Sequence, residues 1–133
     1  MREPYGRAAM SLVHERDIAA VAVQALVQEG HGGAVYELTG PQSLTQAEQV
    51  RVIGDVIGDP VRWEEQSPEE ARRRMLARGW QPDAVDGILL AQAAMTACPA
   101  PVTTTVEKVT GIAPRTFRSW AAQHSHAFHR ATR

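Results

Sequence analysis

The stretch "YELTGPQSLTQAEQ", residues 36–49, decides how the fold is interpreted. Thr45 with Glu48 three residues later forms a capping box, so a turn at Gly40-Pro41 is predicted to lead from a strand into a helix. Nucleotide-binding proteins hold phosphates at such passages, but a dinucleotide site needs Gly-x-Gly-x-x-Gly. Here a single glycine is present, and Pro41 removes an amide donor. The stretch therefore indicates a connection, and we predict no cofactor site and no meaningful affinity for NADH or NADPH.

Strands and helices alternate on both sides of this stretch. Strands are predicted at residues 8–14, 34–38 and 61–66, with amphipathic helices between them. This order favours an α/β fold with a small, parallel-type sheet of about three strands and flanking helices. Helical patterns dominate from residue 67 onward and predict a C-terminal helical cap. We expect one domain over residues 1–133, with an α/β part at 1–66 and the cap at 67–133.

Composition excludes several classes of protein. The net charge of −1 gives no basic surplus for nucleic acid, and no apolar stretch is long enough to cross a membrane. The single cysteine, Cys98, cannot form an internal disulfide, which fits the cytoplasm. No pair of His, Cys, Asp or Glu has a convincing metal spacing, so no metal site is predicted.

Four polar residues follow the first predicted strand, where ligands of open α/β sheets usually lie: His14, Glu15, Arg16 and Asp17. Imidazole exchanges protons near neutral pH, so His14 is the candidate acid–base group, with Glu15 or Asp17 orienting it. On this hypothesis His14→Ala lowers turnover by about 10²- to 10⁴-fold and leaves the melting temperature nearly unchanged. The alternative is structural: Asp17 caps the following helix and Arg16 pairs with a carboxylate.

A substrate pocket needs apolar side chains beside such a polar cluster. We expect the helices of residues 68–96 to cover the cluster, and we name as candidate substrate-binding residues Arg16, Trp63, Met75, Trp80 and Met95. At helical spacing, core packing is the alternative role for the two methionines and for Trp80.

Three motifs together carry a resemblance to a known family. They are "RDIA" at residues 16–19, "YELTGP" at 36–41 and "TGIAPRTF" at 110–117. With their surroundings they resemble the C-terminal half of NmrA-like atypical short-chain dehydrogenases/reductases. The resemblance implies a substrate-binding half without the Rossmann half that carries the glycine-rich loop. Hydride chemistry therefore cannot be assigned to this chain alone.

Three functions remain open. The first, slightly favoured, is a cofactor-independent acid–base enzyme of the isomerase, cyclase or ring-opening type, acting on a small, largely apolar metabolite. The second is a non-catalytic binding or regulatory module, and the third is a subunit that completes a reductase with a separate Rossmann chain. Because a lone small sheet leaves an open edge, we also predict a homodimer or larger oligomer that buries about 800 Å² or more per subunit.

Overall fold

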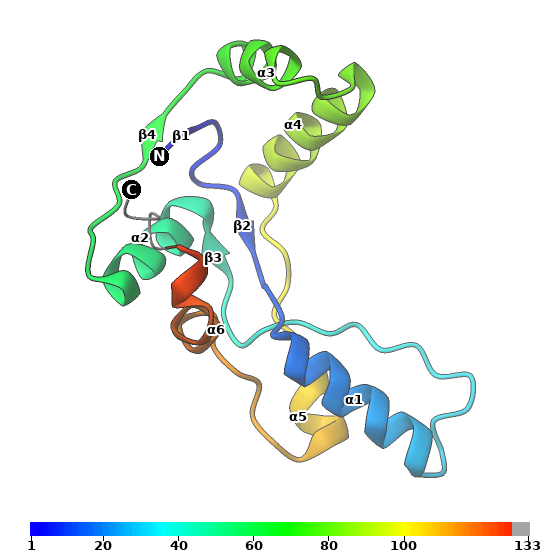
Figure 1. The fold of residues 1–133 in the computed structure, drawn as a ribbon. Coiled ribbons are helices and arrows are strands. Elements are labelled where there is room, and N and C mark those ends of the chain that lie inside the picture. Colours follow the sequence, from blue (N-terminus) through cyan, green and yellow to red (C-terminus); the bar gives the residue numbers. More distant parts are fainter. Residues whose placement is uncertain (129–133) are drawn as a thin grey trace.

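The computed structural model describes residues 1–128, and the last five positions of the predicted cap lie outside the described residues. Three helix pairs follow one another along an open arc (Figure 1). Helix α3 (Pro68–Ala77) packs against α4 (Pro82–Ala97), α2 (Gln46–Ile57) against α6 (Phe117–Gln123), and α1 (Glu15–Val27) against α5 (Thr105–Thr110). A short 3₁₀ helix, Ser125–Ala127, follows α6. The α/β class with flanking helices is confirmed.

The strands are short and form two separate pairs. Strand β1 (Arg2–Glu3) runs parallel to β4 (Glu64–Glu65), and β2 (Ala9–Met10) runs antiparallel to β3 (Leu44–Thr45). The predicted first and third strands are present in shortened form. The strand predicted at residues 34–38 is wrong, because this segment has no strand partner within the described part of the chain.

Buried side chains are divided among the helix pairs. A cluster of Ala71, Val85 and Leu89 joins α3 to α4, with the partly buried Tyr5, Met75 and Leu76 packed against it. Within residues 1–128, none of the helices combines the length and apolar character needed to cross a membrane.

Gly40 shows why the opening stretch is a connection. Its amide donates to the carbonyl oxygen of Ser11 at 3.1 Å, and a Cβ atom added to it would overlap the carbonyl oxygen of Leu12. The glycine is thus required by the close approach of two backbone segments. The predicted capping box is confirmed: the Thr45 hydroxyl accepts from the Glu48 amide, and the Glu48 carboxylate accepts from the Thr45 amide at 2.9 Å.

The capping box gives a pH-dependent prediction. Hydrogen bonds from the Thr45 amide and then from its hydroxyl hold the pKa of Glu48 below its usual 4.5. A carboxylate with a lowered folded pKa stabilises the protein above 4.5, and this contribution is lost as the pH falls through the folded value. We expect Thr45→Ala to lower the free energy of unfolding by about 1 kcal/mol at about pH 7, and by less at about pH 2.5. Urea unfolding at both pH values measures this, and an equal loss at both would contradict the role of the carboxylate.

Candidate functional site

His14 links the end of the β2 segment to the start of α1. It is the N-cap residue of α1, and its Nδ1 accepts a hydrogen bond from the Arg16 amide at 3.2 Å. A neutral ring whose Nδ1 accepts carries its proton on Nε2. The residue is only 2% exposed, and its Nε2 is buried without a hydrogen-bond partner among the described residues. A buried unpaired donor costs about 1–3 kcal/mol, so a ligand oxygen that reached it would be stabilised.

Glu15 connects His14 to a second histidine. Its Oε2 lies 3.2 Å from His14 Nδ1, and its Oε1 lies 3.6 Å from His124 Nε2. The other nitrogen of His124, Nδ1, lies 2.9 Å from the Trp120 carbonyl oxygen. The Glu15 side chain is 54% exposed, whereas that of His14 is 1% exposed. The carboxylate therefore joins a buried imidazole to solvent.

Asp17 does not cap α1, and this prediction is wrong because His14 occupies the N-cap position. The carboxylate of Asp17 is buried and pairs with Arg115, 98 positions away, through the guanidinium and through the amide, which donates at 2.7 Å. This pair fixes the segment before α6 against the first turn of α1. Because the His14 ring caps a helix and is buried, we now expect His14→Ala to lower stability as well as turnover.

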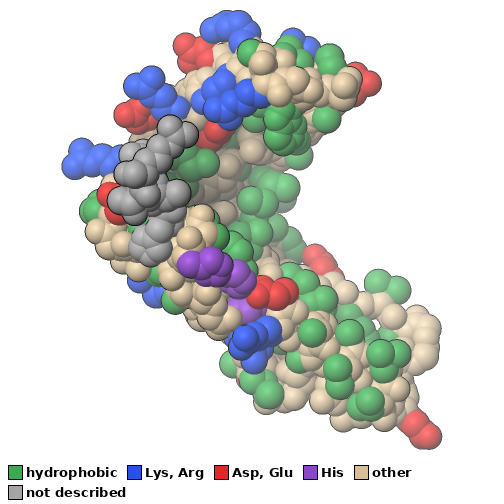
Figure 2. All heavy atoms as spheres, viewed as in Figure 1, with side chains coloured by type: hydrophobic (Ala, Val, Ile, Leu, Met, Phe, Trp, Pro, Cys, Tyr) green, Lys and Arg blue, Asp and Glu red, His purple; other side chains and the backbone are tan. Residues whose placement is uncertain are grey.

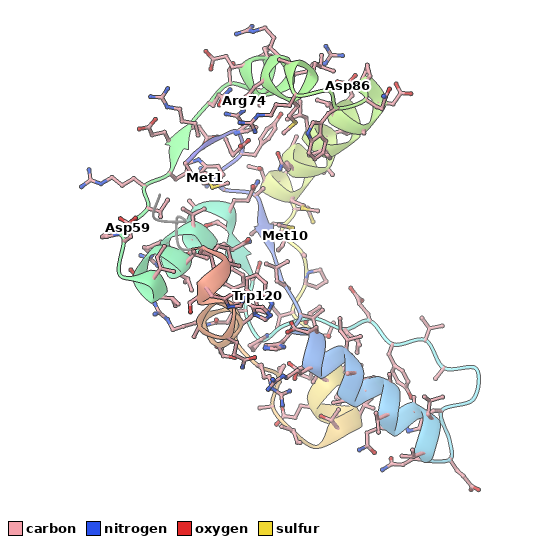
Figure 3. All side chains as sticks on the ribbon, viewed as in Figure 1. Met1, Met10, Asp59, Arg74, Asp86 and Trp120 are labelled. Carbon is pink, nitrogen blue, oxygen red and sulfur yellow. The ribbon has the colours of Figure 1, made fainter. Side chains whose placement is uncertain are left out.

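A cavity of about 310 Å³ lies beside His14. Trp120 projects from α6 toward the segment that joins β2 to α1 (Figure 3). Its ring stacks on Phe117, with centroids 5.5 Å apart, and on His124 at 4.9 Å. Thr116 caps α6 by accepting from the Ser119 amide at 3.1 Å, which sets where the aromatic wall begins. The lining residues are Leu12, Val13, His14, Arg115, Thr116, Phe117 and Trp120.

The prediction that the helices of residues 68–96 cover His14 is wrong. The chain segment before α6 and α6 itself form the wall instead, because α6 packs on α2 beside the β2 segment while α3 and α4 pack on each other. Predicted lining residues are accordingly distributed elsewhere: Met75 packs on the α3–α4 cluster, and Trp80 is 50% exposed.

The other three predicted binding residues also lie outside this cavity. Trp63 is half-buried, and its Nε1 donates to Glu65 at 2.7 Å. Arg16 is exposed in the first turn of α1, and Met95 is half-buried on α4. Of the predicted site residues, His14, Glu15 and Asp17 are thus brought to one place, and the five predicted substrate-binding residues are not.

Four residues that complete the site were not identified from the sequence: Arg115, Phe117, Trp120 and His124. The spacing of Phe117, Trp120 and His124 places them on one helix face, a pattern that is typical of core packing. His124 is 37% exposed by side chain and contacts Glu15, so it is not a buried core residue. Across residues 1–128, no group of three or more His, Cys, Asp and Glu side chains is arranged to hold a metal ion.

Two sequence relatives of the chain are reductases. It is 39% identical to the (4-alkanoyl-5-oxo-2,5-dihydrofuran-3-yl)methyl phosphate reductase of Streptomyces griseus, over 96% of this chain and 45% of that protein. It is 40% identical to the NAD(P)H azoreductase of Xenophilus azovorans, over 94% of this chain and 44% of that protein. No protein-family model matches the chain.

Solved structures support the same fold. Citrobacter sp. triphenylmethane reductase matches with a TM-score of 0.76 at 18% identity, over 94% of this chain and 43% of that chain. The NADPH-dependent quinone oxidoreductase QOR2 of Escherichia coli matches with a TM-score of 0.70 at 23% identity, over 96% and 46%. The chain is therefore similar, along nearly all of its length, to slightly less than half the length of each of these four reductases.

Proposed function

We propose that this chain is the substrate-binding part of an NAD(P)H-dependent reductase. On this proposal the cavity beside His14 binds a flat, largely apolar molecule that carries an oxygen acceptor. The observation that carries it is that His14, whose Nε2 is buried and unpaired, lines a cavity with an aromatic wall. The reductases among the relatives support the proposal, since the chain spans nearly half of each.

The cavity walls favour such a ligand. A volume of about 310 Å³ is at the lower end of the range for small-molecule sites, which are mostly apolar with a few polar groups. Phe117 and Trp120 offer ring faces for stacking. Arg115 is neutralised by Asp17, so it contributes little free positive charge toward an anion.

His14 supplies the chemistry in this proposal. Its Nε2–H donates to the oxygen of the ligand, which draws electron density from the adjacent carbon. If the proton transfers, Nδ1 takes up a replacement that the Glu15 carboxyl, 3.2 Å away, relays from solvent, so the ring stays neutral. After the product leaves, Nδ1 returns this proton to solvent through Glu15 while Nε2 takes one from solvent, which restores the starting state of His14.

The described residues do not fit a nicotinamide dinucleotide. The Leu12 backbone occupies the space beside Gly40, where a phosphate would have to approach. The Thr45 amide at the start of α2 already donates a hydrogen bond to Glu48. No Gly-x-Gly-x-x-Gly occurs in the sequence. We therefore assign the cofactor contacts to the part of the relatives that this chain does not match, and we derive no step through the cofactor.

A second candidate is the cofactor-independent acid–base enzyme of the isomerase, cyclase or ring-opening type. The connected His14, Glu15 and His124 favour it, because such a chain moves protons without a hydride donor. Turnover by the chain alone, with no nicotinamide present, would support this candidate. A binding or regulatory module would bind the same ligands without any turnover.

Paired probes test the proposed site. We expect 1,4-naphthoquinone to bind the chain about 5- to 30-fold more tightly than naphthalene, because only the quinone accepts a hydrogen bond from Nε2. His14→Asn keeps a capping oxygen near the position of Nδ1 and removes Nε2, so it should bind both probes equally. Trp120→Ala is the control and should weaken both probes alike by removing the stacking surface. Equilibrium dialysis measures the Kd values, and equal binding of both probes by the unsubstituted chain would contradict the proposal.

A further inference from the structure

The cavity beside His14 has a cationic side chain in its wall. Among the described residues that line the cavity, Arg115 is the only Lys, Arg, Asp or Glu. Its side chain is 38% exposed and is therefore within reach of a bound molecule, whereas Arg16 is exposed outside the lining. An unpaired guanidinium attracts phosphate, carboxylate and sulfonate groups, because it donates several hydrogen bonds in a fixed plane. The partners of Arg115 thus decide whether the cavity accepts an anion.

Asp17 holds the Arg115 guanidinium from the buried side. The carboxylate is 3% exposed, and its two oxygens accept from the guanidinium and, at 2.7 Å, from the Arg115 amide. A ligand anion that took the guanidinium would leave this carboxylate charged and unpaired in the interior, which is strongly unfavourable. The ion pair therefore stays closed, and a ligand meets a neutral pair instead of a free positive charge.

Other groups at the start of α1 also disfavour an anion. The first turn of the helix contains two carboxylates, those of Glu15 and Asp17, which oppose the positive end of its dipole. The Arg16 amide, a donor of the kind that holds anions at helix starts, is bonded to His14 Nδ1. Glu15 Oε2 lies 3.2 Å from the same nitrogen, so a negative charge lies close to the ring that meets the ligand. Figure 2 shows acidic, basic and histidine side chains close together between α6 and the start of α1.

We propose that Asp17 sets the charge specificity of the cavity, so that its ligand is an uncharged carbonyl compound. A phosphate, carboxylate or sulfonate bonded beside the oxygen acceptor weakens binding, whereas an anionic group on a longer arm stays in solvent. Asp17 does not contact the ligand and acts through Arg115, so it is a positioning residue. This inference rests on the proposed function and narrows the class of substrate.

Two quinones that differ in charge test the specificity. The substituents of 2-tert-butyl-1,4-naphthoquinone and 1,4-naphthoquinone-2-sulfonate are similar in shape, and only the sulfonate is charged. We expect the reference chain to bind the sulfonate about 10-fold more weakly, because a charge that enters the cavity loses water and gains no counter-charge. Equilibrium dialysis measures both Kd values. The reference chain and all variants carry Cys98→Ser, because Cys98 is exposed and its thiol would add to a quinone.

Asp17→Asn should admit the anion. The asparagine side chain would keep an oxygen for the Arg115 amide and remove the charge, so the guanidinium is free to pair with the sulfonate. We expect the sulfonate to bind this variant about 10-fold more tightly than the reference chain, and the tert-butyl quinone to change by less than about 2-fold. This gain should shrink between about 0.05 and 1 M salt, because ions screen a partly exposed charge. The double variant Asp17→Asn with Arg115→Ala should show no gain.

Asp55→Asn is the matched control. It also removes one carboxylate and frees one arginine, Arg118, whose guanidinium lies 2.9 Å from Asp55. Arg118 lies on α6 but outside the cavity lining. The sulfonate should therefore bind Asp55→Asn as it binds the reference chain, which separates the effect of the cavity from that of net charge.

Three results would overturn the charge specificity. Equal binding of the two substituted quinones by the reference chain would show that charge does not select the ligand. A folded Asp17→Asn variant without the gain, or an equal gain in Asp55→Asn, would show that Asp17 does not set the selection. Binding of 1,4-naphthoquinone without any binding of the tert-butyl quinone would show that size limits the ligand instead.

The salt dependence of the reference chain decides the case in which Asp17→Asn does not fold. With Arg115 neutralised, the Kd of the sulfonate should not rise with salt, and a rise would reveal a free cation in the cavity and overturn the specificity. The proposed function fails separately, if 1,4-naphthoquinone binds the reference chain no more tightly than naphthalene. A gain of sulfonate binding in Asp17→Asn would still stand in that case.

Discussion

Arg115→Ala should lower the free energy of unfolding by about 3 kcal/mol. The change leaves the Asp17 carboxylate, 3% exposed, without its charged partner, and breaking a buried pair in this way typically costs about 3–5 kcal/mol. We expect the lower end of that range because two stabilising features remain. The backbone amide of residue 115 still donates to the carboxylate, and the first turn of α1 favours negative charge.

Arg118→Ala is the matched control for this prediction. Arg118 lies on α6, near the same end of the chain, and pairs with Asp55 at 2.9 Å, but both side chains are more than half exposed. Exposed pairs contribute about 0–1 kcal/mol. Urea unfolding of the two variants should therefore differ by about 2 kcal/mol. Equal losses would show that the Asp17 pair is solvated like a surface pair.

The double variant Asp17→Asn with Arg115→Ala separates charge from packing. The asparagine side chain that replaces Asp17 would keep an oxygen for the backbone amide of residue 115 and carry no charge. The double variant should therefore be more stable than Arg115→Ala alone, and the cycle completed with the single variant Asp17→Asn should give an interaction free energy of about 1–3 kcal/mol. A purely additive result would show that the Asp17–Arg115 ion pair does not stabilise the contact between α1 and the segment before α6.

Local signals in the sequence predicted the helices well. Thr45 with Glu48, and Ser67 with Glu70, are complete capping boxes within four residues, and α2 and α3 begin where these boxes place them. The strand at residues 34–38 could not be judged in the same way. A strand needs a neighbour that is distant in sequence, and alternation of side chains does not show whether that neighbour is present.

The candidate site was half predictable for the same reason. His14, Glu15 and Asp17 are consecutive or nearly so, and their place after a strand identified them. Arg115 and Trp120 reach them only through the packing of α6, about 100 positions away along the chain. Nothing in the spacing of "PRTFRSW" distinguishes a cavity wall from a core face, and so the helices of residues 68–96 were predicted to cover the site instead.

We expect His14→Asn to lower turnover by about 10²- to 10⁴-fold in a chimera in which this chain replaces the matched 45% of the Streptomyces griseus reductase, as loss of a general acid does. The measurement is kcat for the substrate that names that reductase. His14→Ala should lower turnover equally and should also cost about 1 kcal/mol of unfolding free energy, because alanine cannot accept the Arg16 amide bond. The two variants share the loss of Nε2 and differ in the cap, so turnover and stability are separated.

Glu15→Gln completes this test, because it changes the path by which His14 regains a proton and leaves Nε2 in place. The side-chain amide that replaces the Glu15 carboxylate would still lie beside Nδ1 but would not relay a proton between solvent and Nδ1. We expect kcat to fall while the Kd of 1,4-naphthoquinone is unchanged, since binding uses Nε2 alone.

Full turnover by the His14→Asn variant would show that His14 takes no part in the reaction. If Glu15→Gln instead weakened quinone binding and left kcat intact, Glu15 would act by positioning the ring, and the route for protons through His124 would be wrong.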